Sequence, residues 1–200
     1  MPERYGLAMR VIAGRLGGRR LQAPPGKLTR PTSDRVKEAV FAMLGSVEGT
    51  NVLDLFAGTG ALAIEALSRG ARSAVFVERD AGALRALNAN LEALAIAPEM
   101  VEVRRADALQ ALDTASARQE TYDLLFIDPP YGRARPAPMA SGPPIAERWG
   151  PELSAILPSL LSPGARVVVE SDRRAPIELD LPLERHRRYG DTSITIHRQQ

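Results

Sequence analysis

Residues 52–63 read VLDLFAGTGALA, and this stretch decides the fold. An apolar strand leads into the pattern Gly58-x-Gly60-x-x-Ala63, and an apolar helical segment follows it. Glycines at this spacing let the backbone turn tightly and approach a ligand at the amino end of the helix. Glu78 lies 20 residues after Gly58, where such a unit places an acid that binds ribose hydroxyls. The stretch therefore predicts a nucleotide-binding strand–turn–helix unit.

Strands and helices alternate from this stretch onward, with apolar runs such as VFV, LLFI and VVV. Runs of this kind are typical of parallel strands buried on both faces. The strands are expected at residues 51–57, 73–79, 101–107, 122–128 and 165–171, and the helices at 60–69, after Asp80, at 109–118 and at 151–161. The tail 184–198 reads as two strands around Gly190-Asp191. The pattern predicts an α/β, Rossmann-like fold: a mostly parallel sheet flanked by helices and ended by a C-terminal antiparallel hairpin.

The amino-terminal part is organised differently. Residues 10–23 read RVIAGRLGGRRLQA and predict a small β-hairpin, because Gly17-Gly18 suits a tight turn. The prolines and glycine of residues 24–31 predict a linker. The chain is therefore interpreted as an N-terminal hairpin extension with its linker over residues 1–31 and an α/β domain over residues 32–200.

The composition excludes several classes of protein. The chain has 200 residues and no cysteine, which rules out disulfides and thiolate metal sites. No apolar run approaches membrane-spanning length. We expect a cytoplasmic, monomeric protein with no metal site and no membrane partner.

Charge is distributed unevenly along the chain. Residues 1–37 hold nine Lys or Arg and two acids, a net +7, so a total of +2 leaves −5 for the rest. A basic arm on a mildly acidic body suggests a polyanion such as RNA. A solvated basic surface explains the same charge, and charge alone does not choose between the two. The candidate RNA contacts are Arg10, Arg15, Arg19, Arg20 and Arg30.

The acids near the glycine turn indicate which nucleotide binds. Asp54 lies in the strand just before the turn, where a negative charge would disfavour a pyrophosphate. A carboxylate there suits a cationic ligand, and S-adenosylmethionine carries an ammonium and a sulfonium but no phosphate. Asp107 ends the third strand and can accept a hydrogen bond from an adenine amino group. These acids favour S-adenosylmethionine over NAD.

The fourth strand ends in Asp128-Pro129-Pro130-Tyr131. Proline fixes φ and lacks a backbone donor, so this turn presents acceptors: the Asp128 carboxylate and the Pro129 carbonyl. Two acceptors can hold the two N–H bonds of a nucleobase amine and aim its lone pair at a methyl group. Tyr131 can stack on the base. The alternative is a plain turn with a helix-capping Asp.

The motifs VLDLFAGTG, FVERD, ADAL and DPPY, in this order, resemble class I adenosylmethionine-dependent amino-methyltransferases. The segments RVIAGRLGGRRL, TRPTSDRVKEAVF and YGDTSITI are similar to the RsmD family, bacterial enzymes that methylate the exocyclic N2 of a guanine in 16S rRNA. The resemblance covers residues 9–198. It implies S-adenosylmethionine as cofactor and 16S rRNA, or a small-subunit assembly intermediate, as partner.

The resemblance also assigns residues. It implies that the target base would be held by Asp128, Pro129, Pro130 and Tyr131. The implied cofactor residues are Thr32, Arg35, Asp54, Phe56, Ala57, Gly58, Thr59, Gly60, Glu78, Arg79, Asp107 and Ala108. Two features depart from the family: Met9 stands where its members commonly begin, and residues 132–151 form a longer link than usual. Five prolines and three glycines in that link predict irregular structure over most of it.

Other functions remain open at this point. An adenine-N6 methyltransferase acting on DNA or RNA would use the same DPPY turn, although no target-recognition domain is visible. A small-molecule amine methyltransferase and a non-catalytic ribosome-assembly RNA-binding factor are further alternatives. An NAD oxidoreductase would need a proton donor at the site, and His186 and His197 fall in the terminal hairpin, where we expect them on the surface.

Overall fold

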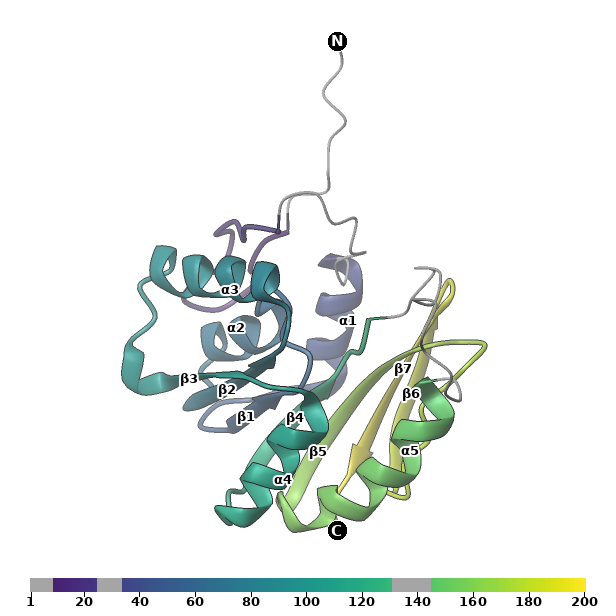
Figure 1. The fold of residues 1–200 in the computed structure, drawn as a ribbon. Coiled ribbons are helices and arrows are strands. Elements are labelled where there is room, and N and C mark those ends of the chain that lie inside the picture. Colours follow the sequence, from purple (N-terminus) through teal and green to yellow (C-terminus); the bar gives the residue numbers. More distant parts are fainter. Residues whose placement is uncertain (1–8, 25–33, 131–144) are drawn as a thin grey trace, which may run out of the picture.

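The computed structural model describes residues 9–24, 34–130 and 145–200, with the side chains of the last segment described from residue 149. A seven-stranded sheet crosses the molecule in the order β3-β2-β1-β4-β5-β7-β6, with helices on both faces (Figure 1). The strands are β1 (Asn51–Asp54), β2 (Ser73–Glu78), β3 (Val101–Arg105), β4 (Tyr122–Ile127), β5 (Leu161–Asp172), β6 (Leu183–Tyr189) and β7 (Thr192–Arg198). The helices are α1 (Asp34–Leu44), α2 (Ala61–Ser68), α3 (Ala81–Ala93), α4 (Ala108–Ala117) and α5 (Ile145–Ile156), with 3-10 turns η1 (Pro98–Met100) and η2 (Leu157–Ser159).

Strands β1 to β5 are mutually parallel, and β7 runs antiparallel to both β5 and β6. The chain proceeds from β1 outward to β3 and then returns to place β4 on the other side of β1. Such a reversal creates a crevice at the carboxyl ends of the central strands, where these folds bind ligands. The predicted Rossmann-like sheet and its C-terminal antiparallel hairpin are confirmed. We call the rim of the sheet where β1 to β4 end the carboxyl edge. The rim where these strands begin is the amino edge.

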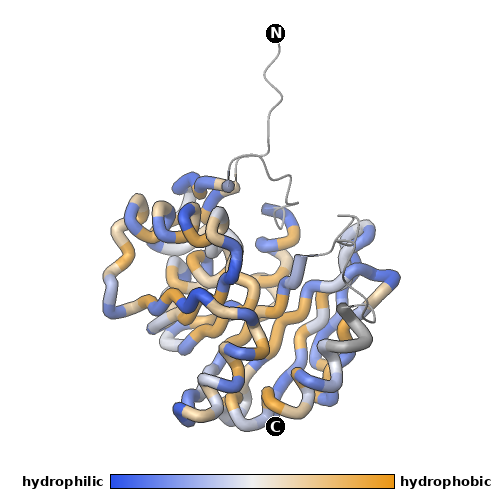
Figure 2. The backbone as a smooth tube through the Cα atoms, viewed as in Figure 1, coloured by the Kyte–Doolittle hydropathy of each residue, from blue (hydrophilic) through white to orange (hydrophobic). Residues whose placement is uncertain are grey.

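The central strands are apolar because both of their faces are covered. Successive residues of β4 point to opposite sides: Leu124 and Phe126 pack with α1, α2 and α3, whereas Leu125 and Ile127 pack with α4 and α5. Figure 2 shows the resulting apolar band along the sheet between more polar outer segments. At roughly 25 cal/mol per Å² of buried apolar surface, these two layers supply most of the favourable folding free energy.

Helix α5 corrects one sequence-based expectation. The helix expected at residues 151–161 begins earlier, because α5 starts at Ile145 and contains Pro151. Its buried Trp149 and Leu153 join the layer with α4, and this packing outweighs the weak helical preference of proline. Gly150 is needed for close contact, since a Cβ there would lie 2.6 Å from the Glu178 carbonyl oxygen. The part of the link before residue 145 lies outside the described residues.

Residues 9–24 form an N-terminal arm that packs on the body of the protein. Met9, Val11, Leu16 and Leu21 are buried in the layer with α1, α2 and α3. The arm follows the path of a hairpin, but it has a single antiparallel bridge, between Arg10 and Arg20, in place of two strands.

The arm keeps some hydrogen bonds of its own, since the Val11 N–H donates to the Arg19 carbonyl oxygen and the Leu21 N–H to the Met9 carbonyl oxygen. Other backbone donors of the arm are taken by α2. The Ile12 and Ala13 N–H groups donate to the Glu65 carboxylate, and the Leu16 N–H donates to Ser68 Oγ. These groups are therefore used between the arm and α2 and not within a strand ladder. The division of the chain at residue 31 stays a prediction.

Candidate cofactor and active site

Four acids follow the four strands of the carboxyl edge. Asp54 ends β1 and Glu78 ends β2, while Asp128 comes directly after β4 and Asp107 comes two positions after the last residue of β3. These strands are parallel neighbours in the order β3-β2-β1-β4, so the sheet brings acids that are up to 74 residues apart in the sequence to one edge. The acidic edge predicted from the sequence is present.

The two glycines of the turn after β1 have different tasks. Both adopt positive φ, 55° at Gly58 and 84° at Gly60, where other residues are strained. A Cβ on Gly60 would lie 2.5 Å from Leu87 Cδ1, so this glycine lets α2 and α3 pack closely. At Gly58 the nearest described atom to an added Cβ would be the Phe56 carbonyl oxygen at 3.9 Å. The backbone at Gly58 is therefore open to a close approach by a ligand.

Glu78 fixes this turn. Its Oε2 accepts a hydrogen bond from the Gly58 N–H at 2.9 Å, and its Oε1 accepts from the Arg79 and Asp80 N–H groups at 2.8 and 2.7 Å. The same carboxylate thus joins the end of β2 to the glycine turn. Its contact with a ribose stays a prediction.

Asp54 is the most unusual of the four acids. Its residue is 1% exposed, and its Oδ1 has no hydrogen-bond partner among the described residues. Burial, followed by the nearby charge of Asp128, raises the pKa of Asp54 to about 7. A buried carboxylate with an unused acceptor is costly unless a donor or cation reaches it. The site therefore fits a cofactor that brings a cationic group.

Asp107 has local partners. Its Oδ1 accepts from the Leu109 N–H at 3.2 Å and caps α4, and its Oδ2 pairs with Arg79 Nη1 at 3.1 Å. Ala108 is the buried first residue of α4. The adenine contact expected of Asp107 would have to form beside this exposed ion pair, and it stays a prediction.

The remaining predicted site residues are only partly within the described chain. Asp128 is half-buried, Pro129 is buried and Pro130 is exposed, and Arg35 is exposed on α1. Tyr131, Thr32 and Arg30 lie outside the described residues.

The arginines of the arm are exposed, as expected from the sequence, but three of them have partners. Arg10 Nε lies 2.9 Å from Asp34 Oδ2, and Arg15 Nη2 donates to Met100 Sδ at 3.7 Å. Arg19 Nη2 donates to the Ala93 carbonyl oxygen at 2.7 Å, at the last residue of α3 and toward the amino edge. Their RNA contacts stay predictions.

Trp149 is a site residue that sequence reasoning missed. Its ring lies against Phe56 of the glycine turn, with centroids 5.0 Å apart and an interplanar angle of 53°. The single tryptophan of the chain, just after a proline-rich segment, was the only available signal.

Asn90 was missed as well. Its Nδ2 donates to the Thr59 carbonyl oxygen at 3.0 Å and to Gln22, while its Oδ1 accepts from the Gln22 N–H. Asn90 thus joins α3, the glycine turn and the arm. A buried amide on the apolar stripe of α3, between Leu87 and Leu91, was the signal that could have found it.

One of the two histidines was placed wrongly by the sequence. His186 is exposed, but His197 is 6% exposed, and its Nδ1 lies 2.9 Å from the Leu181 carbonyl oxygen. Burial lowers the pKa of His197. His197 pairs with Val167 of β5, toward the amino edge. Its side chain is buried because alternate residues of β7 face the layer with α5. It is therefore no proton donor for the carboxyl edge.

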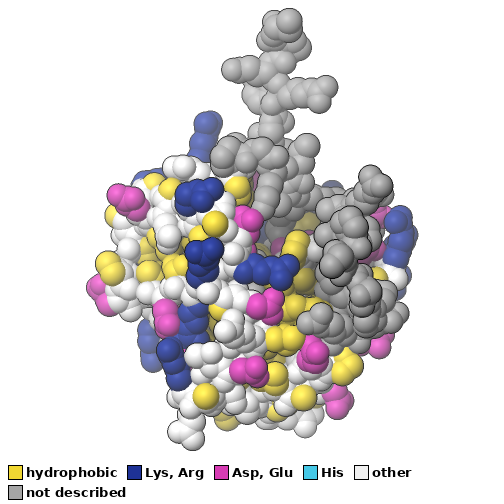
Figure 3. Space-filling view, in the orientation of Figure 1, with side chains coloured by type: hydrophobic (Ala, Val, Ile, Leu, Met, Phe, Trp, Pro, Cys, Tyr) yellow, Lys and Arg dark blue, Asp and Glu magenta, His cyan; other side chains and the backbone are white. Residues whose placement is uncertain are grey.

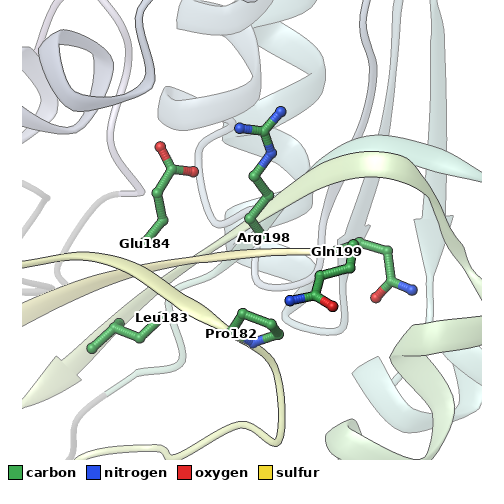
Figure 4. Close-up of a pocket in the computed structure, with 6 residues that line it drawn as sticks. Pro182, Leu183, Glu184, Arg198 and Gln199 are labelled. Atoms are coloured by element: carbon green, nitrogen blue, oxygen red, sulfur yellow. The ribbon is translucent and has the colours of Figure 1, made fainter.

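A pocket in the described structure lies away from the acids. It is formed where β6 begins and β7 ends, at the amino edge (Figure 4). Its lining residues are Pro182, Leu183, Glu184, Arg198, Gln199 and Gln200. The described residues contain no group of three His, Asp or Glu side chains placed to hold a metal ion. Among the helices of the described chain, none has the length and apolar character that crossing a bilayer requires.

The sheet order, the glycine turn and the acids of the carboxyl edge define a class I adenosylmethionine-dependent methyltransferase. The model of the family described as conserved hypothetical protein 95 matches residues 9–198. The chain belongs to this family, the RsmD family.

Curated relatives carry names that agree with this family. YlbH of Bacillus subtilis (strain 168), which bears the name of an rRNA methyltransferase, is 36% identical over 201 residues, covering 96% of this chain and 100% of its own. A Haemophilus influenzae protein named ribosomal RNA small subunit methyltransferase D is 38% identical over 124 residues, 62% of this chain and 64% of its own.

Solved structures share the fold. The Escherichia coli protein yhhF, described as a methyltransferase, has a TM-score of 0.75 at 28% identity and covers 96% of this chain and 98% of its own. The 16S rRNA N2 G1207 methyltransferase RsmC of T. thermophilus, solved with AdoMet and guanosine, has a TM-score of 0.62 at 21% identity, covering 88% of this chain and 44% of its own.

Proposed function

We propose that the protein transfers a methyl group from S-adenosylmethionine to the exocyclic N2 amine of a guanine in 16S rRNA. The observation that carries the proposal is the Asp128-Pro129 turn, which follows β4 directly beside the strand that ends on Asp54. Two acceptors that would suit a nucleobase amine thus follow the strand next to a buried carboxylate that would suit a cationic cofactor. The names of the relatives support rRNA as the substrate.

The cofactor, when bound, supplies an electrophilic methyl group on a sulfonium. Asp54 would face its cationic part, and the open backbone at Gly58 would let it come close to the turn. Glu78 holds that turn in place through the Gly58 N–H. Phe56, with Trp149 behind it, would form an apolar wall.

The amine is activated by acceptors. The Asp128 carboxylate and the Pro129 carbonyl would accept the two N–H bonds of the guanine amine, whose lone pair is otherwise delocalised into the ring. Positive charge develops on this nitrogen during transfer, so a carboxylate stabilises the transition state more than the ground state. After transfer, one proton leaves the nitrogen, with Asp128 as the nearest acceptor in this scheme.

The test uses 16S rRNA and small subunits from cells that lack this enzyme, with methyl-labelled cofactor and nucleoside analysis after digestion. We expect labelled N2-methylguanosine from the wild-type protein. Asp128→Ala should lower the rate by about 10²-fold or more, the scale of losing an electrostatic contact to the reacting group. It should leave cofactor affinity in place, and Asp128→Asn should keep part of the activity.

Each alternative has its own outcome. Label in N6-methyladenosine would replace the guanine assignment by the adenine one. No transfer to either RNA would favour a binding factor. Wild-type turnover by the Asp128→Ala variant would remove this residue from the chemistry. We also propose a cytoplasmic monomer, and the comparison of free rRNA with the particle identifies which of them is the substrate.

A further inference from the structure

Strand β6 is a basic edge strand. It reads LERHRRY, and its side chains are exposed except for the half-buried Tyr189. The strand has one neighbour, β7, and ends one side of the sheet. Figure 3 shows Lys and Arg side chains at the right-hand margin of the molecule, the side on which β6 and β7 lie in Figure 1.

Some charges of this region are paired within the protein. Arg185 lies 3.7 Å from Glu184, and Arg174, in the turn after β5, lies 3.6 Å from Asp191. Within the described chain, no carboxylate lies at ion-pair distance from Arg173, Arg187 or Arg188. We call these last three the hairpin arginines.

The strand register places the hairpin arginines beside the carboxyl edge. Ile127 of β4 is level with Val169 of β5, so the next residue, Asp128, is level with Glu170. Glu170 pairs with Ile194 of β7, and Ile194 pairs with Arg187.

Arg187 is therefore at the same height along the strands as Asp128, three strands away. At ~4.8 Å per strand, the two backbones are about 14 Å apart. Arg188 is one residue farther toward the carboxyl edge, and Arg173 follows directly after β5 on the same side.

We propose that the hairpin arginines bind phosphates of the RNA strand whose base enters beside Asp128, from the corner of the sheet where Arg187 and Arg188 leave opposite faces of the edge strand. This inference rests on the proposed function, because it takes RNA as the substrate. A distance of about 14 Å is spanned by a few nucleotides of a single strand. Guanidinium groups suit phosphate, because their fixed donors match its oxygens. These contacts position the RNA and do not read its sequence.

The arm supports this assignment by contrast. Arg15 and Arg19 hydrogen-bond to Met100 and Ala93, near η1 and the end of α3, toward the amino edge. Asp128 lies at the other edge of the sheet. The hairpin arginines are on the correct side and have no acidic partner in the described chain.

A competing explanation is protection of the sheet edge. Charged residues on an edge strand prevent pairing with other chains, and this role would need no RNA.

The experiment compares Arg187→Gln/Arg188→Gln with a matched control, Arg72→Gln/Arg118→Gln, which removes the same charge at the amino edge. Glutamine keeps the strand polar and soluble. Binding of a fluorescent single-stranded RNA of about 20 nucleotides is measured over a salt series, together with calorimetry of S-adenosylhomocysteine. Light scattering reports association of the protein with itself.

We expect the hairpin variant to bind RNA about 10-fold more weakly at low salt. Its slope of log affinity against log salt should be reduced by about 0.7 for each lost contact. Affinity for S-adenosylhomocysteine should not change, the control should bind RNA as the wild type does, and Arg187→Lys/Arg188→Lys should restore most of the binding.

Two results would overturn the inference: wild-type affinity and slope in the hairpin variant, or equal losses in the control. Self-association of the variant with unchanged RNA affinity would assign the arginines to edge protection. The proposed function is tested separately, because its test is which nucleoside is methylated and not the affinity for RNA.

Discussion

Asp54 shows how a single residue can connect folding with ligand binding. The backbone N–H groups of Phe56 and Ala63 lower its pKa, but burial and the charge of Asp128 raise it more, to about 7 from 3.8. At neutral pH, Asp54 is therefore protonated in about half of the ligand-free folded molecules, whereas the unfolded chain releases this proton. A cationic ligand beside Asp54 would favour the charged form, so cofactor binding should release this proton.

The sign of the effect gives a prediction for Asp54→Asn. Because the pKa of Asp54 is higher in the folded state, ionisation of Asp54 lowers the free energy of unfolding as pH rises from about 4 to about 7. Above pH 7 this loss of stability is constant. The full difference in pKa corresponds to at most about 4 kcal/mol. Asparagine cannot ionise, so the ligand-free variant should be more stable than the wild type at pH 8 and similar to it at pH 4.5.

Denaturant unfolding at the two pH values measures this difference, and calorimetry with S-adenosylhomocysteine at pH 8 should show weaker binding by the variant. Glu48→Gln, an exposed change away from the edge, is the control. An equal stability difference at both pH values would contradict the assignment of the shifted pKa to Asp54.

At the scale of elements, a buried ion pair attaches the arm to the body. Lys37 of α1 and Glu65 of α2 are both fully buried, with Nζ and Oε2 3.6 Å apart. Glu65 also accepts from the Ile12 and Ala13 N–H groups, and Lys37 Nζ donates to the Arg10 carbonyl oxygen. Burial lowers the pKa of Lys37, and the Glu65 charge partly offsets this. Two helices thus satisfy backbone groups of the arm that the arm's own hydrogen bonds leave unused.

Replacing Glu65 by Gln should destabilise the protein by about 3–5 kcal/mol, because it leaves Lys37 buried without a partner charge. The double variant Lys37→Met/Glu65→Gln removes both charges and should recover part of this loss. Thermal unfolding measures stability, and amide exchange at Ile12 and Ala13 reports on the arm. Glu38→Gln, an exposed change on α1, is the control. A loss below about 1 kcal/mol for Glu65→Gln would show that the pair does not hold the arm.

At the scale of the whole molecule, α5 brings Trp149 back to the glycine turn after β1. Trp149 and Phe56 lie 93 positions apart in the sequence, yet their rings are in contact. The chain that follows the Asp128-Pro129 turn therefore comes back to the glycine turn. Binding of a ligand beside Phe56 should therefore change the environment of Trp149.

Because Trp149 is the single tryptophan, its fluorescence reports on this contact. We expect its emission to change when S-adenosylhomocysteine is titrated, with a midpoint equal to the calorimetric Kd. Phe56→Leu should reduce the amplitude, whereas Phe41→Leu, distant from the turn, should not. Emission that is unaffected by saturating ligand would contradict the coupling.

The sequence by itself determined the repeating pattern and the carboxyl edge. Strand and helix periodicity, the glycine turn and the cap at Asp80 are local properties, encoded within a few residues, and all of them are present. The acids could be placed at one edge because each ends its own strand and parallel strands share an edge. The motif order also predicted the RsmD family, which the family match confirms.

Only the tertiary structure decided what depends on residues far apart in the chain. Glu65 and Ile12 are 53 positions apart, and their hydrogen bond, with others of its kind, supplements the few hydrogen bonds that the arm forms along its own hairpin path. The helical start of α5, the burial of His197 and the contact of Trp149 likewise follow from which layer covers each face. Local propensity has a free energy of about 1 kcal/mol or less per residue, apart from about 3 kcal/mol for proline inside a helix. Burial of a large side chain is worth about 1.5–3 kcal/mol, so burial of several such side chains outweighs local propensity where the fold supplies partners.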